Sequence, residues 1–185
     1  MKTNDTLVKI SKMLSKHLRH KPDALGIRLE PGGWVDVDIL IQAFANKGFE
    51  LTRETLETVV TNNDKQRFSF NEDSSKIRAN QGHSVEVDLE LEPQTPPAIL
   101  FHGTASDRVT SILESGIQKM NRHHVHLSSE IQTVIAVGSR YGKPVVLVVD
   151  ANAMFEAGYV FYCSSNGVWL VDEVPVKYLS LREKV

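Results

Sequence analysis

The stretch GHSVEVDLELEPQTPP, residues 82–97, decides how this chain is organised. Its first part alternates acidic residues with valine and leucine, and its last five residues contain three prolines. The alternation would permit an edge strand. Proline cannot donate to a strand ladder, however, and like charges keep a chain extended, so we interpret the stretch as a connection. It predicts two domains, residues 1–92 and residues 93–185.

The N-terminal domain has the pattern of a winged helix, which is three short helices followed by a hairpin. Leucine and isoleucine recur at helical spacing between residues 7 and 18, and Pro22 is expected to end this first helix. Residues 34–37 are predicted as a short strand. Further helices are predicted at residues 39–44 and from Thr52 onward, and the turn-like residues 71–74 separate the two strands of the hairpin.

The C-terminal domain is richer in strands. The predicted strands are residues 98–101, 124–128, 145–149, 161–162, 168–170 and 178–181, with helices near 107–113 and 131–137. No G-x-G-x-x-G sequence is present, so the usual dinucleotide-binding fold is not indicated. We therefore expect an α+β chain, with a winged-helix-like lobe followed by a mixed lobe.

Composition excludes several classes of protein. The 185 residues are 41% hydrophobic and carry a formal net charge of −2, which gives no global positive field to attract nucleic acid or an anionic membrane. The single cysteine, Cys163, excludes an intrachain disulfide, and no apolar run approaches the ~20 residues of a membrane span. We expect an unprocessed, monomeric cytoplasmic protein with no membrane partner.

Positive charge is nevertheless concentrated in one place. Residues 1–28 contain seven Lys or Arg against two Asp, a local balance of +5. Helical rotation gathers several of these cations on one face, which is formed by Lys9, Lys12, Lys16, Arg19 and His20. Such a face indicates either a polyanion partner or a merely solvated helix surface. Arg67, at the start of the hairpin, could grip a phosphate or be an exposed arginine with no specific contact.

Residues 122–128 form the densest group of polar side chains. If they are extended, alternation places Arg122, His124, His126 and Ser128 on one face. This face could bind a small ligand or phosphate, or serve structural hydrogen bonds. A zinc site is the competitor, but no nearby carboxylate or cysteine completes a set of ligands, so we expect no metal.

Two shorter segments carry weaker signals. His102-Gly103-Thr104 is predicted where a strand meets a helix, so that the glycine permits close backbone approach while the histidine and threonine bond a ligand. A structural histidine is the alternative. Arg140, between two glycines, lies in either an anion-binding loop or a plain helix cap and turn.

Five motifs together resemble the KptA family of RNA 2'-phosphotransferases. They are LRHKP at 18–22, GWV at 33–35, KQRF at 65–68, FHGT at 101–104 and RHHVHLS at 122–128. The resemblance follows the order of the family's motifs along nearly the whole chain. It implies a winged-helix RNA lobe joined to an NAD-binding lobe of the ADP-ribosyltransferase type, with a split β-sheet.

The resemblance also implies site residues. The family's essential Arg-His-Arg-Arg set maps onto Arg19, His20, Arg67 and Arg122. Its NAD site maps onto His102, Gly103, Thr104, His126 and Ser128, with Arg140 as a looser extrapolation.

The implied reaction transfers the 2'-phosphate of a spliced tRNA or similar RNA to NAD. The phosphate would first become ADP-ribosylated, and the products would be RNA with a free 2'-hydroxyl, nicotinamide and ADP-ribose 1'',2''-cyclic phosphate. Two alternatives remain. One is an ADP-ribosyltransferase that modifies terminal phosphates of RNA or DNA, and the other is a non-catalytic winged-helix protein that binds nucleic acid.

Overall fold

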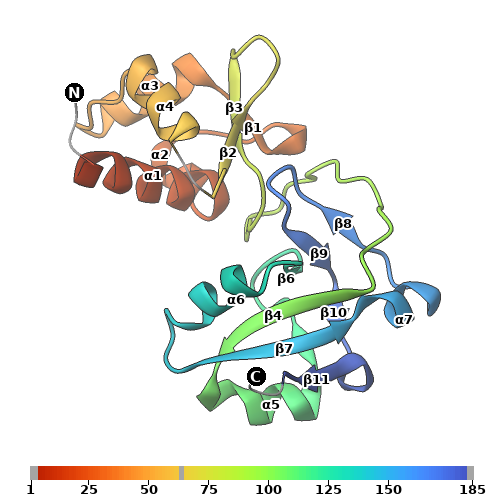
Figure 1. Cartoon of the computed structure of the whole chain (residues 1–185). Coiled ribbons are helices and arrows are strands. Elements are labelled where there is room, and N and C mark those ends of the chain that lie inside the picture. The colour runs from red at the N-terminus through yellow and green to blue at the C-terminus, as the bar shows by residue number, and fades with distance from the viewer. Residues whose placement is uncertain (1–3, 63–64, 183–185) are drawn as a thin grey trace. The chain divides into compact units, whose positions relative to one another are not determined.

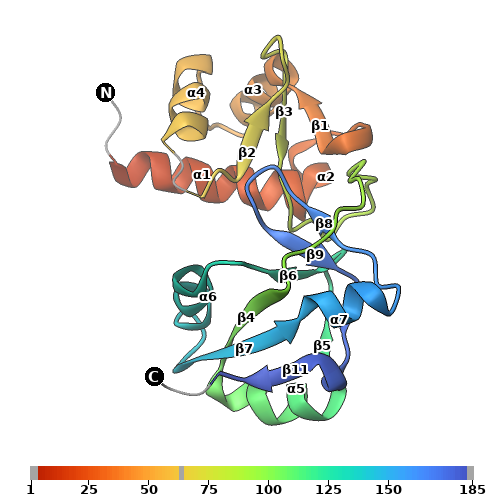
Figure 2. The same ribbon diagram turned by 45° about the vertical axis from the view of Figure 1, so that its right-hand side comes forward.

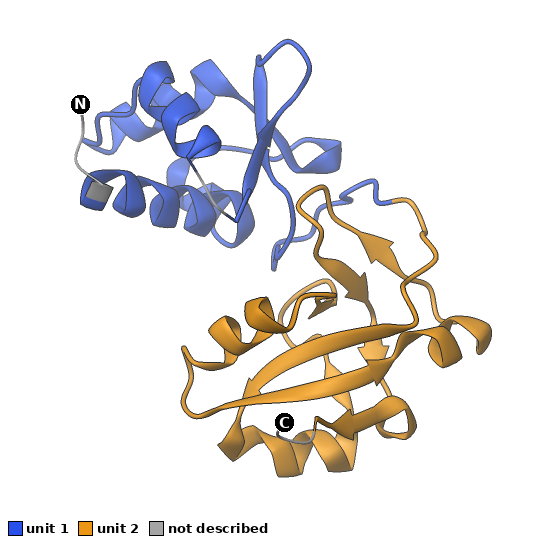
Figure 3. Ribbon diagram, viewed as in Figure 1, with its two compact units in different colours: residues 1–91 blue, residues 92–185 orange. Residues whose placement is uncertain are grey.

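The computed structural model describes residues 4–62 and 65–182 and divides into two compact units (Figure 1). Unit 1 comprises residues 1–91 and unit 2 residues 92–185 (Figure 3). The division lies one residue before the boundary expected from the sequence. Across the described residues the chain is mixed α/β, with seven α-helices and several small antiparallel sheets. None of these helices combines the length and apolar character needed to cross a membrane.

Unit 1 begins with α1 (Asn4–Arg19), which buries the apolar side of its predicted pattern. Leu14 and Leu18 are fully buried, whereas Lys12 and Lys16 are exposed. The helix ends at Arg19, ahead of Pro22, as predicted, but Pro22 has a second role that was not predicted. It opens a further short helix, α2 (Pro22–Leu25), because proline is well suited to a first helical turn, where its missing N–H is not needed.

Two more helices of unit 1 begin at side-chain caps. Asp36 accepts hydrogen bonds from the N–H groups of Asp38 and Ile39 at the start of α3 (Val37–Asn46). Thr52 accepts from the N–H of Thr55 at the start of α4 (Arg53–Thr61). A capping oxygen satisfies backbone donors that have no partner within the helix, which explains why both helices start there. The helix start predicted at Thr52 is confirmed.

A three-stranded antiparallel sheet completes unit 1. Its order is β1-β3-β2, formed by β1 (Trp34–Asp36), β3 (Lys76–Ala79) and β2 (Phe68–Phe70). Strand β3 pairs with both neighbours, so the predicted hairpin β2–β3 is confirmed. A short 3-10 turn, η1 (Pro31–Gly33), precedes β1. The helices and the sheet bury one apolar core, which includes Leu14, Leu18, Leu40, Phe44, Leu56, Phe68 and Ile77.

Unit 2 is built on two three-stranded antiparallel sheets. The first has the order β11-β7-β4, from β11 (Leu179–Leu181), β7 (Pro144–Asp150) and β4 (Ile99–Ala105), which run side by side in Figure 2. The second has the order β6-β9-β8, from β6 (Val125–Leu127), β9 (Trp169–Val171) and β8 (Tyr162–Cys163). A short pair links β5 (Ile117–Gln118) to β10 (Glu173–Val174).

The two sheets of unit 2 join at one backbone bridge. The N–H of Phe101 donates to the carbonyl of Ser128 at 2.8 Å, and the N–H of Ser128 returns a bond at 3.0 Å. The bridge joins Phe101, within β4, to Ser128, the residue that follows β6. The buried side chains between the sheets include Leu100, Val125, Leu127, Leu147 and Val149.

Short helices surround these sheets. They are α5 (Val109–Ser115), α6 (Ile131–Gly138) and α7 (Ala151–Glu156), with the 3-10 turns η2 (Ser106–Arg108) and η3 (Val176–Tyr178). Helix α6 packs directly across β4 and β7. Two glycines permit this approach. A β-carbon on Gly103 would lie 1.9 Å from the carbonyl oxygen of Val134, and one on Gly138 would lie 2.6 Å from that of Thr104.

Candidate functional site

The described part of unit 1 contains a groove of about 680 Å³ between α1, α4 and the residues that lead into β2. Five of its lining side chains are basic, namely Lys12, Lys16, His20, Lys65 and Arg67. Serine, threonine and asparagine side chains and a few aliphatic groups complete the lining. A groove with these side chains is suited to a chain that carries phosphate groups. The cations attract the phosphates, and the polar side chains can form hydrogen bonds with the other polar groups of such a chain.

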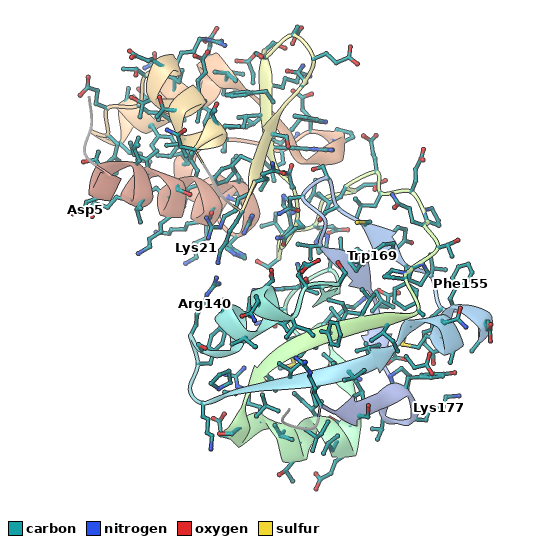
Figure 4. All side chains as sticks on the ribbon, in the orientation of Figure 1. Asp5, Lys21, Arg140, Phe155, Trp169 and Lys177 are labelled. Carbon is teal, nitrogen blue, oxygen red and sulfur yellow. The ribbon has the colours of Figure 1, made fainter. Side chains whose placement is uncertain are left out.

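Two of the residues that the family resemblance assigned to the reaction, His20 and Arg67, line this groove, and a third, Arg19, bonds the backbone of Arg67. Arg19 is half-buried, and its Nη2 atom donates to the carbonyl oxygen of Arg67 at 3.4 Å. His20 follows α1 directly and lines the groove together with Arg67. Figure 4 labels the next residue, Lys21, just beyond the last turn of α1. Residues 48 positions apart in the chain are thereby neighbours.

A buried asparagine holds the chain that leads into Arg67. Asn80 donates from its backbone N–H to the carbonyl of Arg67 at 2.9 Å and from Nδ2 to that of Gln66 at 2.6 Å. Its Oδ1 accepts from the hydroxyl of Ser69 at 2.7 Å. Gln66 has a φ of 41°, in the left-handed region that side-chain-bearing residues seldom adopt. Asn80 therefore stabilises an unfavourable turn, and sequence reasoning missed it because a lone asparagine carries no pattern.

The ring of His20 is fixed by Ser84. Nδ1 of His20 lies 2.8 Å from the hydroxyl oxygen of Ser84, and the N–H of Ser84 donates to the carbonyl of Arg19 at 2.9 Å. The side chain and the backbone of Ser84 thus bind consecutive residues at the end of α1. In the sequence, Ser84 belongs to the predicted connection, where nothing in the composition distinguishes it.

In unit 2, two histidines and an arginine form a connected row that joins β4 to β6 and to the turn before β6. Nδ1 of His102 donates to the carbonyl oxygen of His126 at 3.1 Å. Nη1 of Arg122 lies 3.4 Å from Nδ1 of His126. A guanidinium can only donate, so Nδ1 of His126 is the acceptor in this pair. The row brings together Arg122, His102 and His126.

Burial lowers the pKa of His102 below its ordinary value, and the charge of Arg122 adds to the lowering. The ring is therefore neutral at pH 7. Since its Nδ1 carries the proton that is donated to His126, its Nε2 is a hydrogen-bond acceptor. Such a nitrogen is suited to a hydroxyl donor such as that of a ribose.

The location predicted for His102-Gly103-Thr104 was wrong. Strand β4 continues through these residues to Ala105 instead of ending before them. Successive side chains of a strand point to opposite faces, so Gly103 points away from the face of its two neighbours. The close approach expected at Gly103 is made by the backbone of α6. Thr104 is buried, with 5% of its surface exposed.

The predicted strand at residues 124–128 is shorter than expected. It covers Val125–Leu127, and the burial alternates as predicted, with Val125 and Leu127 inside and His126 half-buried. Arg122 lies outside the strand, in a turn whose N–H bonds the carbonyl of Lys119. The prediction that Arg122 lies on the same strand face as His126 is therefore wrong, although its guanidinium still reaches the ring of His126.

The remaining predicted residues have local contacts. The hydroxyl of Ser128 accepts from the N–H of Glu130 at 3.0 Å, ahead of α6. The ring centroid of His124 lies 5.4 Å from that of Tyr162, and burial lowers the pKa of His124. Arg140 is exposed after the end of α6 (Figure 4), and no hydrogen bond or ion pair within residues 4–62 and 65–182 joins it to the row.

Among the residues that the structure describes, no three His, Cys, Asp or Glu side chains lie close enough together to hold a metal ion.

Comparison with known proteins gives a consistent result. The family model described as RNA 2'-phosphotransferase, Tpt1 / KptA family, matches residues 5–173. Relatives named "Probable RNA 2'-phosphotransferase" from Trichormus variabilis and Nostoc punctiforme are both 62% identical, over 94% and 96% of this chain and 96% and 98% of their own. A relative of the same name from Streptomyces coelicolor is 51% identical over 93% of each chain.

Proposed function

This chain belongs to the Tpt1 / KptA family of RNA 2'-phosphotransferases, and from that premise we propose that it transfers an internal 2'-phosphate of RNA to NAD. In this reaction a phosphate oxygen attacks the nicotinamide ribose carbon and nicotinamide leaves with the bond electrons. The neighbouring ribose hydroxyl then attacks phosphorus, and the RNA oxygen departs and takes up a proton. The products are RNA with a 2'-hydroxyl, nicotinamide and ADP-ribose 1'',2''-cyclic phosphate.

The observation that carries the proposal is that His20 and Arg67 line one groove in unit 1 and that Arg19 bonds the backbone of Arg67 beside it. A phosphate that is already ionised near pH 7 needs little base assistance as a nucleophile. The protein's task is then to position the phosphate and to compensate its charge, which arginines do well. Arg19 and Arg67 are assigned to the phosphate, and His20 to a hydrogen bond and the proton of the second step.

Unit 2 is proposed as the NAD-binding, ADP-ribosyltransferase-like lobe, and unit 1 as the winged-helix RNA lobe. The neutral ring of His102, with an accepting Nε2, fits a ribose hydroxyl of NAD. Arg122 beside His126 supplies a positive charge for the phosphate groups. Gly103 is assigned no contact with NAD. It allows α6 to pack against β4 and thereby positions the strand that carries His102.

The direct test is incubation with NAD and an RNA that bears one internal 2'-phosphate, with the products identified by mass. We expect the mass of the RNA to fall by about 80 Da, the mass of one HPO₃ group, only when NAD is present, because NAD receives the phosphate. No NAD-dependent loss would refute the proposal. A stable ADP-ribosylated RNA or DNA end would instead identify an enzyme that modifies terminal phosphates.

The assignment of residues is tested by Arg67→Ala and Arg122→Ala, with Lys47→Ala as a control for loss of a surface charge. Lys47 is exposed at the end of α3, outside the residues assigned to the reaction. Loss of a charge-compensating arginine should lower kcat/KM at least about a hundredfold. Near-normal turnover in either variant, with a folded protein, would show that the arginine does not act on the reacting groups.

A further inference from the structure

The groove of unit 1 continues well beyond the residues assigned to the reacting phosphate. Along α1 its lining runs from His20 back to Lys12 and on to Leu7. We propose that this extension holds the ribonucleotides on one side of the 2'-phosphate, so that the enzyme binds a length of RNA strand rather than a single nucleotide. The inference rests on the proposed function, because that function places the 2'-phosphate at the His20 end.

The chemistry of the extension suits a polynucleotide strand. Lys12 and Lys16 are exposed, and neither forms a hydrogen bond or ion pair through its side chain within the residues that the structure describes. None of the described lining residues is acidic. Two free ammonium groups therefore face the groove with no internal anion to neutralise them, which favours phosphates of a backbone.

The polar lining favours RNA in particular. Ser11 and Ser15 bring hydroxyl groups to the groove and Asn62 brings an amide. These groups both donate and accept hydrogen bonds, as a ribose 2'-hydroxyl also does. The flat face of a base can contact the aliphatic side chains of Leu7 and Val8, which also line the groove.

The length of the extension limits how much RNA it can hold. A helix rises 1.5 Å per residue, so the axis advances about 18 Å from His20 to Val8, which is most of the length that the lining covers along α1. A stacked strand advances about 3.4 Å per nucleotide. The groove therefore accommodates about five stacked nucleotides at most, and fewer if the strand is extended.

Binding measurements on RNA of increasing length test the inference. The probes are oligoribonucleotides with one 2'-phosphate, lengthened by one to eight nucleotides on the 5' side in one series and on the 3' side in another. We expect the dissociation constant to fall with length in one series only, and to level off by about five added nucleotides. Equal gains in both series, or no gain in either, would overturn the inference.

Variants show whether the lysines of the groove are responsible. Lys12→Ala should weaken binding of the long probes by about fivefold at low salt, which is the upper range for an exposed ion pair. It should also reduce the slope of log Kd against log salt by about 0.7, the value for one phosphate of a single strand. Lys47→Ala should change neither quantity. Lys9, on α1 but outside the lining, should give a smaller loss than Lys12. If Lys9→Ala and Lys12→Ala weakened RNA binding equally, the lysines would act through the general charge of α1 and the groove would not be the binding site.

Turnover of the shortest probe with NAD, measured in parallel, separates the two proposals. If the short probe is turned over but length has no effect, the groove inference fails and the enzymatic function stands. If no probe loses its phosphate but length and Lys12 control binding as stated, the groove is an RNA site and the proposed reaction is wrong.

Discussion

Replacing Gly103 by alanine should destabilise unit 2 severely. The added β-carbon would lie 1.9 Å from the carbonyl oxygen and 2.6 Å from the carbonyl carbon of Val134. These are backbone atoms of α6, so no side-chain rotation relieves the overlap and the helix itself must move. Overpacking costs about 1–3 kcal/mol where side chains can adjust, and we therefore expect a loss of at least about 3 kcal/mol. For a unit of fewer than 100 residues this lowers Tm by at least about 12 °C.

The measurement should report unit 2 alone. The chain has two tryptophans, Trp34 in unit 1 and Trp169 in β9, so Trp169 fluorescence in a Trp34→Phe background follows unit 2 during unfolding. The control is Gly158→Ala, where φ is 91° but no atom lies within 4 Å of the added carbon. Backbone strain alone then costs about 1–2 kcal/mol. If Gly103→Ala were no more destabilising than Gly158→Ala, α6 would not pack as closely as described.

Two further substitutions test the chemistry of the site. Ser84→Ala should lower kcat about tenfold with little change in KM, because it removes the hydroxyl that orients His20, and Ser84→Thr should restore most of the rate; equal rates for the two variants would exclude this role. The free energy of unfolding should fall as the pH drops below about 6.5, because burial lowers the folded-state pKa of His102 and the unfolded chain takes up the proton first. His102→Gln should reduce the loss of unfolding free energy between pH 7.5 and pH 5, measured by urea titration at both. An unchanged loss would show that the burial of His102 does not cause it.

The local structure of unit 1 could largely be predicted from the sequence. The spacing of Leu14 and Leu18 identifies the buried side of α1, and Thr52 marks the start of α4. These features depend on neighbouring residues, whose periodicity and capping are visible in the chain itself. Pro22 shows the limit, since the same residue can end one helix or begin another.

Long-range packing explains what could not be predicted in unit 2. The strand was expected to end at Phe101, with a helix starting near His102-Gly103-Thr104. It continues because it pairs with β7 as far as Ala105, and Gly103 is accommodated there because α6, some thirty residues further along the chain, packs against it. Helix α7 and the short strands β5 and β10 were missed because they are too short for a periodic pattern.

The candidate site was predictable only in part, for a related reason. Composition indicated the cationic face of α1, but it could not bring Arg67 next to Arg19, which takes the fold of the whole unit. The family resemblance supplied that pairing. Ser84 and Asn80 belong to none of the quoted motifs, and only their contacts in the folded chain identify them.

The lysines of α1 also bear on the speed with which the protein meets a partner. Residues 1–28 carry a balance of +5 within a chain of net charge −2, so the remaining residues carry −7. An approaching polyanion is attracted by the first segment and repelled by the rest, which orients the two molecules before they touch. A uniform sphere of charge −2 would associate with RNA faster as salt is added. The separated charges of this chain predict the reverse, an association rate constant that falls with ionic strength.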